Sequence, residues 1–373
     1  MLTTVQIYQS EIAPPEVRGR MIAVQLVTIN SAGQIIAFTG FGTYHVSNPA
    51  LQWRLPVALQ CVPAIALFIG GFFIPFSPRW LAMKGRHEEA RKVLRRLHDD
   101  HANPLFWERE YAQMVAQLEH ERRETAGVNS FHMFTNWREL HRALLAVVGL
   151  TSLQTNGAQT IFIFQSILYA SLGYSTGKIL LMACFFQLLC IVGGIGNILA
   201  IDWLGRRILM MSGLIGLSVV LGAFMACVAE FEKTGNTAWG KAGVAMVMIY
   251  IWFYGVTYIS TGYAYAAEVL PTKIRAQGMA LGMLCAYVCI IIFRQVTPIA
   301  YAEVSYRYVS LFIAFNMFFL PIIYFFCHET KGLTLEEING LFGEEVQRTI
   351  DEDPDGAVHD KSINVEEKET VMV

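Results

Sequence analysis

The feature that most constrains this chain is a series of long apolar runs with few charged residues inside them. A helix needs about 20 mainly apolar residues to cross the hydrocarbon core of a membrane. Only 16% of the 373 residues are charged, against about 25% in an ordinary soluble domain. We therefore predict an all-α polytopic membrane protein with eight spans, at residues 21–43, 55–75, 143–169, 179–201, 208–229, 242–267, 276–300 and 308–327.

The distribution of lysine and arginine predicts how these spans are oriented. Between the second and third spans lies a charge-rich segment, 78–142, in which Leu94, Leu97, Met114 and Leu118 recur at helical spacing. If this segment is cytoplasmic, 22 of the 28 basic residues lie on the inner side. We predict amphipathic helices over 78–142 at the cytoplasmic membrane surface, with both chain termini in the cytosol. The acidic sequence within 328–373 predicts a cytoplasmic tail that is partly disordered.

Charge and motif content exclude several function classes. A net charge of −2 gives no reason to expect nucleic acid as a partner. The seven cysteines lie in or beside apolar runs and form no C-x-x-C pair, so we expect neither a disulfide framework nor a metal site. The sequence has no nucleophile–base motif and no phosphate-binding glycine loop. We therefore expect neither an enzyme nor a cofactor.

An internal repeat indicates a duplicated architecture. The pattern E-x-x-P-x-x-x-R occurs from Glu11 to Arg18 and again from Glu268 to Arg275, and two spans follow each copy. Such repeats are common in transporters. The second copy lies within six spans, at 143–327, whereas residues 1–77 hold two spans and a short helical stub. We predict a 6+6 helix bundle that is truncated at its N-terminus, with 1–77 as the remnant of the first half.

Five motifs together resemble the sugar-porter family of the major facilitator superfamily, in its fungal form. They are S-E-I-A-P-P-E-V-R-G at 10–19, S-P-R-W-L at 77–81, G-R-H-E-E-A at 85–90, D-W-L-G-R-R at 202–207 and E-T-K-G-L-T-L-E-E-I at 329–338. The resemblance implies a plasma-membrane transporter that moves a small sugar, a related polyol or a sugar acid, with or without a co-transported proton. A non-transporting sugar sensor on the same fold stays open as an alternative. Because one wall of the cavity is predicted to be absent, we do not expect this chain alone to complete transport.

Charged residues at the predicted cytoplasmic helix ends are candidates for a conformational gate. Gly205 permits a tight turn between two spans and sets Arg206 and Arg207 within reach of Glu268. Ion pairs at such a place can hold one face shut in one state and part in another. The arginines could instead only anchor the inner ends of the spans, so both interpretations stay open. The gate candidates are Glu11, Arg18, Asp202, Arg206, Arg207, Glu268, Arg275 and Glu329.

The resemblance also indicates residues that could bind the hydroxyls of a sugar. Where the family carries a run of amides, this chain has L-Q-T-N-G-A-Q at 153–159, and amides offer both donors and acceptors. Gln154 and Gln159 would line a broad face of one helix. The substrate-binding candidates are Gln25, Gln154, Gln159, Tyr263 and Tyr287, and packing in the interior stays open for them.

Arg294 is an unusual charge inside a predicted span. It lies 19 residues beyond Arg275, in the outer part of the span. Three interpretations stay open: the side chain reaches out to the membrane surface, pairs with an acid, or binds an anionic substrate such as a sugar acid. In the same span, Gly278 and Gly282 form a G-x-x-x-G motif that predicts a close helix contact.

Overall fold

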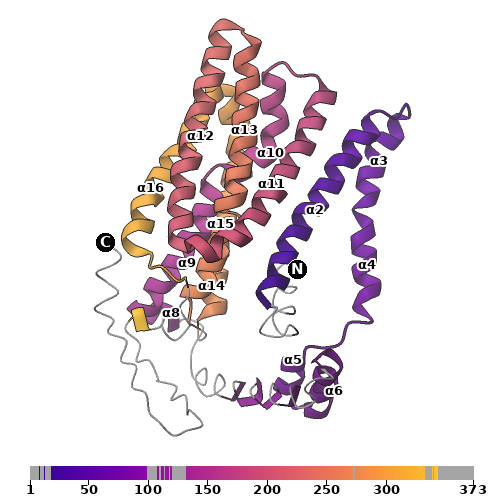
Figure 1. The fold of residues 1–373 in the computed structure, drawn as a ribbon, viewed down its shortest axis with the longest axis vertical. Coiled ribbons are helices and arrows are strands. Elements are labelled where there is room, and N and C mark those ends of the chain that lie inside the picture. Colours follow the sequence, from indigo (N-terminus) through magenta and orange to yellow (C-terminus); the bar gives the residue numbers. More distant parts are fainter. Residues whose placement is uncertain are drawn as a thin grey trace. The chain divides into compact units, whose positions relative to one another are not determined.

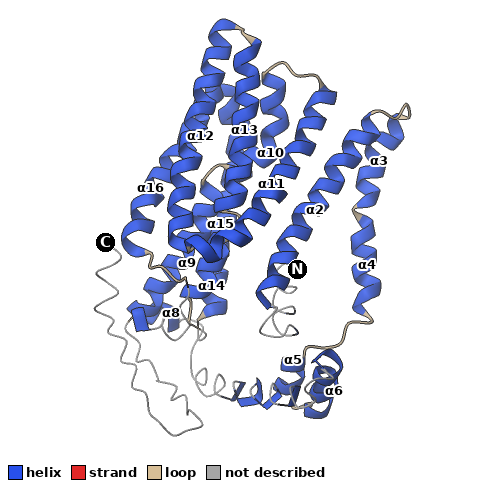
Figure 2. Ribbon diagram, viewed as in Figure 1, coloured by secondary structure: helices blue, strands red, loops and turns tan. Residues whose placement is uncertain are grey.

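The computed structural model describes residues 18–98, 132–271 and 274–331, with isolated positions within 8–12, 107–119 and 338–342. The chain divides into two units, 1–332 and 333–373, and only the first is described below. All regular structure among the described residues is helical (Figure 2). The tail that we predict to be partly disordered lies almost entirely outside the described residues.

The first membrane-type helices are α2 (Arg18–Tyr44), α3 (Pro49–Leu59) and α4 (Cys61–Gly71). The Asn48 side chain caps α3 by accepting the Ala50 backbone N–H at 3.0 Å. Pro63 has no N–H to donate to the carbonyl of Leu59, and the helix is interrupted between these two residues. No residue of α3 or α4 is buried, so their apolar side chains are available to lipid.

The segment after α4 forms a small helical unit with its own core. It contains α5 (Pro78–Met83) and α6 (His87–His98). As the spacing predicts, Leu94 is buried and Met114 and Leu118 pack on the same cluster, whereas Leu97 is 39% exposed. The buried residues of this cluster are Leu81, Ala82, Ala90, Leu94 and Tyr111.

The remaining helices form a bundle in which α11 and α12 pack on α13, α14 and α15 pack on α9, and α16 packs on α12 (Figure 1). Helix α2 packs on α11. The bounds are α8 (His132–Thr135), α9 (Trp137–Thr155), α10 (Ala158–Ser171), α11 (Thr176–Leu204), α12 (Arg206–Thr234), α13 (Thr237–Thr257), α14 (Thr261–Val269), α15 (Arg275–Val304), the 3-10 helix η1 (Ser305–Val309) and α16 (Ser310–Phe326).

Within the part of the chain that the structure describes, five helical segments are long and apolar enough to cross a membrane by length and composition. They are 49–71, 176–201, 206–234, 237–269 and 275–326, and the last contains both α15 and α16. The predicted spans 21–43 and 143–169 are not among these five, although both are helical in the structure. The second of them is divided between α9 and α10, and α9 begins at Trp137, ahead of the predicted start.

Glycines allow several pairs of elements in the bundle to approach closely. A Cβ atom at Gly193 of α11 would lie 2.5 Å from the carbonyl oxygen of Trp252 and 2.9 Å from the Cα atom of Gly255, both in α13. On α15, a Cβ at Gly282 would lie 2.7 Å from Leu150 of α9, and one at Gly278 would clash with Leu270 after α14. The close contact predicted from the G-x-x-x-G motif is therefore present.

Two segments that we predict as continuous spans are interrupted inside the bundle. Between α9 and α10, Gly157 has φ +100° and the Asn156 side chain accepts the Ala158 N–H at 2.9 Å. Between α13 and α14, the Asn197 amide donates to the Val256 carbonyl at 2.7 Å. These bonds satisfy backbone groups that a break would leave exposed. The expectation that Gln154 and Gln159 share one helix face is therefore wrong, because they belong to α9 and α10.

Candidate functional site

A single residue connects α11 and α12, two long apolar helices of the bundle. Helix α11 ends at Leu204 and α12 begins at Arg206, so Gly205 forms the whole turn, with φ +91°. This backbone conformation favours glycine. A Cβ atom at this position would lie 2.7 Å from the Oε2 atom of Glu329. The turn therefore brings the start of α12 against the segment that follows α16.

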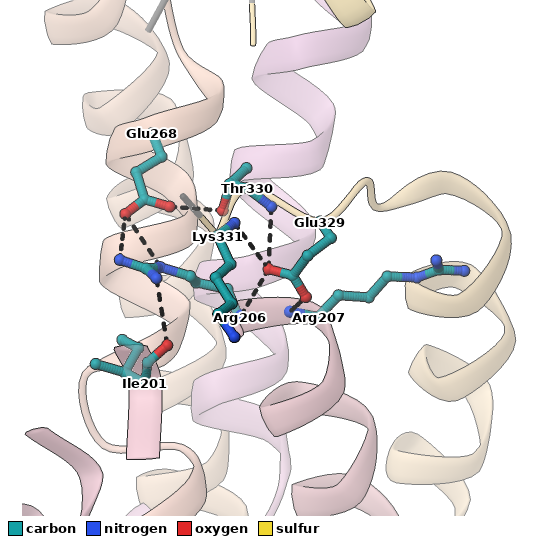
Figure 3. A network of polar contacts seen from close by, with 7 residues as sticks. All are labelled: Ile201, Arg206, Arg207, Glu268, Glu329, Thr330 and Lys331. Carbon is teal, nitrogen blue, oxygen red and sulfur yellow. Dashed lines mark hydrogen bonds and ion pairs between the residues drawn. The ribbon is translucent and has the colours of Figure 1, made fainter. Parts of the chain in front are cut away.

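The Glu329 carboxylate caps the N-terminus of α12 (Figure 3). Its Oε1 accepts the backbone N–H of Arg206 at 2.8 Å, and its Oε2 accepts that of Arg207 at 3.1 Å. The first N–H groups of a helix have no partner within the helix, and the helix dipole favours an anion there. Because the capping residue comes from another part of the chain, this contact fixes the segment 328–331 to α12.

The Glu268 carboxylate links three elements. Its Oε1 forms an ion pair with Nη2 of Arg206 at 3.0 Å and accepts the Arg206 Nε–H at 3.2 Å. Its Oε2 accepts the hydroxyl of Thr330 at 2.6 Å. The side chains of Arg206 and Glu268 are 15% and 26% exposed. Helices α12 and α14 and the segment after α16 are thus held together at one partly shielded place (Figure 3).

Cationic side chains satisfy carbonyl groups at the C-terminal ends of α11 and α14. These ends carry the negative pole of the helix dipole. The bonds are Arg206 Nη1 to the Ile201 carbonyl at 3.2 Å, Lys331 Nζ to the Trp203 carbonyl at 2.7 Å, Arg142 Nε to the Val269 carbonyl at 2.7 Å, and Arg275 Nε to the Leu270 carbonyl at 3.2 Å. Arg142, which we place in the cytoplasmic segment from its sequence, is only 1% exposed.

His328 precedes the capping residue. Burial lowers the pKa of its imidazole, and the nearby charges of Arg207 and His141 lower it further. We therefore expect the ring to be uncharged at neutral pH, so that it adds no cation to the network.

The structure brings together four of the predicted gate residues: Arg206, Arg207, Glu268 and Glu329. Arg275 donates to a backbone carbonyl at the end of α14. Glu11 and the side chains of Arg18 and Asp202 lie outside what the structure describes. The network also contains Thr330 and Lys331, which are not among the predicted gate residues. Both follow Glu329 directly in the E-T-K-G motif, and this position could have indicated them.

Three of the predicted substrate-binding residues meet in the bundle. A Cβ atom at Gly262 of α14 would lie 3.6 Å from Leu153 of α9, so Tyr263 and Gln154 follow two residues that are in contact. Tyr263 also packs on the core cluster that contains Ala286, the residue before Tyr287 on α15. The Oε1 atom of Gln154 is buried and has no partner among the described residues. Gln159 is half-buried on α10, and the side chain of Gln25 is not described. The cluster Gln154–Tyr263–Tyr287 therefore offers one free amide acceptor and aromatic surface.

Replacing Gly205 with alanine is expected to weaken the junction of α11 and α12. The new Cβ would strain a backbone with positive φ and displace the Glu329 carboxylate, at a combined cost of about 1–3 kcal/mol. Thermal unfolding of the purified protein measures this as a lower Tm. The matched control is Gly222→Ala on α12, where a Cβ meets nothing within 4 Å. Equal Tm values for the two variants would show that Glu329 does not constrain the turn.

Comparison with known proteins identifies the family. Residues 1–342 match the family described as "Sugar (and other) transporter". The chain belongs to this family. Among curated members, it is 30% identical over 346 residues to the MFS-type transporter criB of Aspergillus cristatus, covering 91% of this chain and 69% of that protein. It is 28% identical over 348 residues to a probable quinate permease of Aspergillus niger, covering 90% of this chain and 64% of that protein.

Among solved structures, the chain resembles the proton:xylose symporter XylE of the major facilitator superfamily, bound to 6-bromo-6-deoxy-D-glucose. The TM-score is 0.70 at 19% identity, over 90% of this chain and 70% of that one. The chain therefore has the major facilitator fold that its motifs predict. It spans about two thirds of the length of these three proteins.

Proposed function

We propose that this protein acts in the plasma membrane as a transporter of the major facilitator type, moving a sugar, a related polyol or a sugar acid by alternating access. The end of the bundle that carries the Glu268–Arg206–Glu329 network faces the cytosol in this proposal, because most basic residues then lie inside. We include a co-transported proton, as in the proton:xylose symporter with the same fold.

The observation that carries the proposal is the network around Glu268. Anchoring the ends of helices in the headgroup region needs only the arginines. A carboxylate on α14 that bonds both Arg206 of α12 and Thr330 after α16 does more, because it ties separate elements to each other. Such contacts can form in one conformation and part in another without rebuilding any helix. This supports a gate rather than an anchor.

The Gln154–Tyr263–Tyr287 cluster supports binding of a hydroxylated solute. A buried amide oxygen without a partner is costly unless a ligand or water satisfies it. Interrupted helices near such a site are typical of transporters, in which discontinuous helices surround the substrate. The break after Thr155 lies one residue beyond Gln154, so the same feature occurs here.

Solute binding by the purified chain in lipid nanodiscs tests this proposal. We expect a saturable rise in Tm with at least one member of a panel of neutral sugars, polyols and sugar acids. Gln154→Leu should weaken that binding by about tenfold, the cost of one hydrogen bond to a buried group. The matched control is Gln165→Leu on α10, outside the cluster. A panel in which no solute raises the Tm would refute the proposal.

A further inference from the structure

Arg294 is a lone charge on an apolar stretch of α15. Its side chain is exposed, and no hydrogen bond or ion pair joins it to another of the described residues. Its neighbours on the helix include Ile291 and Ile292, which are 66% and 52% exposed. A charge within a membrane-spanning helix is costly unless it meets water, an acid or a ligand. The direction in which this face of α15 points therefore decides what Arg294 can bind.

The internal repeat indicates this direction. Arg18 and Arg275 end the two copies of E-x-x-P-x-x-x-R, and they are also the first residues of α2 and α15. Counting from these residues, Asn30, Gly33 and Ala37 of α2 correspond to Tyr287, Ile290 and Arg294 of α15.

On α2, this face packs against protein. The carbonyl of Asn30 accepts Nε2 of Gln187 on α11 at 3.0 Å, and a Cβ at Gly33 would lie 2.9 Å from the same nitrogen. By the repeat, the face of α15 with Tyr287 and Arg294 corresponds to a face that packs on protein and not on lipid. Both side chains are exposed among the described residues, so they are accessible to a ligand.

Arg294 also stands in line with the substrate-binding cluster. It follows Tyr287 by seven residues, which is two helical turns or about 10 Å along the same face. Tyr287 follows Ala286, which belongs to the core cluster on which Tyr263 packs, and Gly262 lies against Leu153, the residue before Gln154. If the cluster binds a solute through the solute's hydroxyls, the guanidinium of Arg294 therefore lies toward the outer end of that solute. Guanidinium binds carboxylate through two parallel hydrogen bonds.

We propose that the solute is a hydroxylated carboxylic acid, with its carboxylate on Arg294 and its hydroxyls on Gln154, Tyr263 and Tyr287. This inference rests on the proposed function and narrows its substrate class. It assigns Arg294 as a residue that sets specificity for anionic over neutral solutes.

Matched pairs of neutral and anionic solutes test the assignment. Glucose with glucuronate, and inositol with quinate, differ chiefly by a carboxylate. We expect the purified chain in nanodiscs to bind the anion of at least one pair more tightly than its neutral partner, by thermal shift or calorimetry. Arg294→Gln should weaken binding of the anion by about 10- to 100-fold, the worth of a charge-assisted bond, and leave the neutral solute within about twofold. Arg294→Lys should restore part of the loss.

The matched control is Arg307→Gln, which removes an exposed arginine from η1. Binding of neutral solutes alone would overturn this inference and leave the proposed function standing, whereas binding of no solute would overturn both. An equal loss for neutral and anionic solutes in Arg294→Gln, without rescue by lysine, would assign Arg294 a structural role. If Arg294→Gln fails to fold, the preference of the unaltered chain within each pair decides the question, and equal affinities contradict the inference.

Discussion

A valine at position 193 is expected to prevent the bundle from assembling. The Cβ atom would lie 2.5 Å from the Trp252 carbonyl oxygen and 2.9 Å from the Cα atom of Gly255. Both obstacles are backbone atoms of α13, so no side chain can move aside, and α11 and α13 must separate. We expect a loss above about 4 kcal/mol, which belongs to the most damaging class of single substitutions. In practice, detergent-extracted Gly193→Val should aggregate in size-exclusion chromatography.

The adjacent glycine provides the control for this experiment. A Cβ atom at Gly194 meets nothing within 4 Å, so Gly194→Val changes the same helix by the same side chain without the clash. This variant should elute as the unaltered protein does. A Gly193→Val protein with normal elution and normal Tm would show that α11 and α13 do not approach each other as described.

The second large effect is expected from Glu268→Gln. Glutamine keeps the shape of the side chain and an acceptor for Thr330, but removes the charge that faces Arg206. Removing the negative charge that Arg206 faces at this partly shielded place should cost about 2–3 kcal/mol. In the proposed gate, this shifts the balance toward the inward-open state by roughly 30- to 150-fold. The segment 328–331 should then detach, and trypsin should cleave after Lys331 faster.

The ion pair between Glu230 and Lys233 supplies the control for trypsin cleavage. The two side chains are 2.8 Å apart but 41% and 68% exposed, and exposed pairs contribute little. Glu230→Gln should therefore leave the rate of cleavage after Lys331 unchanged. A rate that is equally unchanged in Glu268→Gln would show that the ion pair does not hold the segment in place.

Much of the fold could be predicted from the sequence, because a long apolar run can satisfy its backbone hydrogen bonds in a membrane by forming a helix. The pairing of motifs likewise predicted the repeat and the family. The helix breaks were missed, since Asn156 and Gly157 lie inside an apolar run that looks continuous. The Asn–Gly pair is nonetheless a known turn signal. The break near Ser260 has a weaker signal, because it depends on Asn197, 63 residues away, whose side chain bonds both Ser260 and Thr261.

At the candidate site too, contacts set by short loops could be predicted, whereas contacts between residues far apart in the sequence could not. The charges at 206, 207 and 268 could be assigned to one cluster from topology, since short loops place them at the same ends of neighbouring helices. That Glu329 caps α12 could not be predicted, because the contact spans 123 residues and depends on the close fit at Gly205. Arg142 was assigned to the charged segment by its neighbours, whereas its side chain bonds the end of α14.

In the proposed transporter, the Glu268 network holds the cytoplasmic end of the bundle closed. Cys327 can report on it directly, because it is 3% exposed and immediately precedes the segment 328–331. In a variant whose other six cysteines are replaced, a membrane-impermeant maleimide added to inside-out vesicles should label Cys327 slowly. Glu268→Gln should raise the labelling rate at least about tenfold, as the expected population shift requires, and Glu230→Gln should not change it. Equal labelling rates in all three proteins would contradict the gate and leave the arginines as anchors of the helix ends.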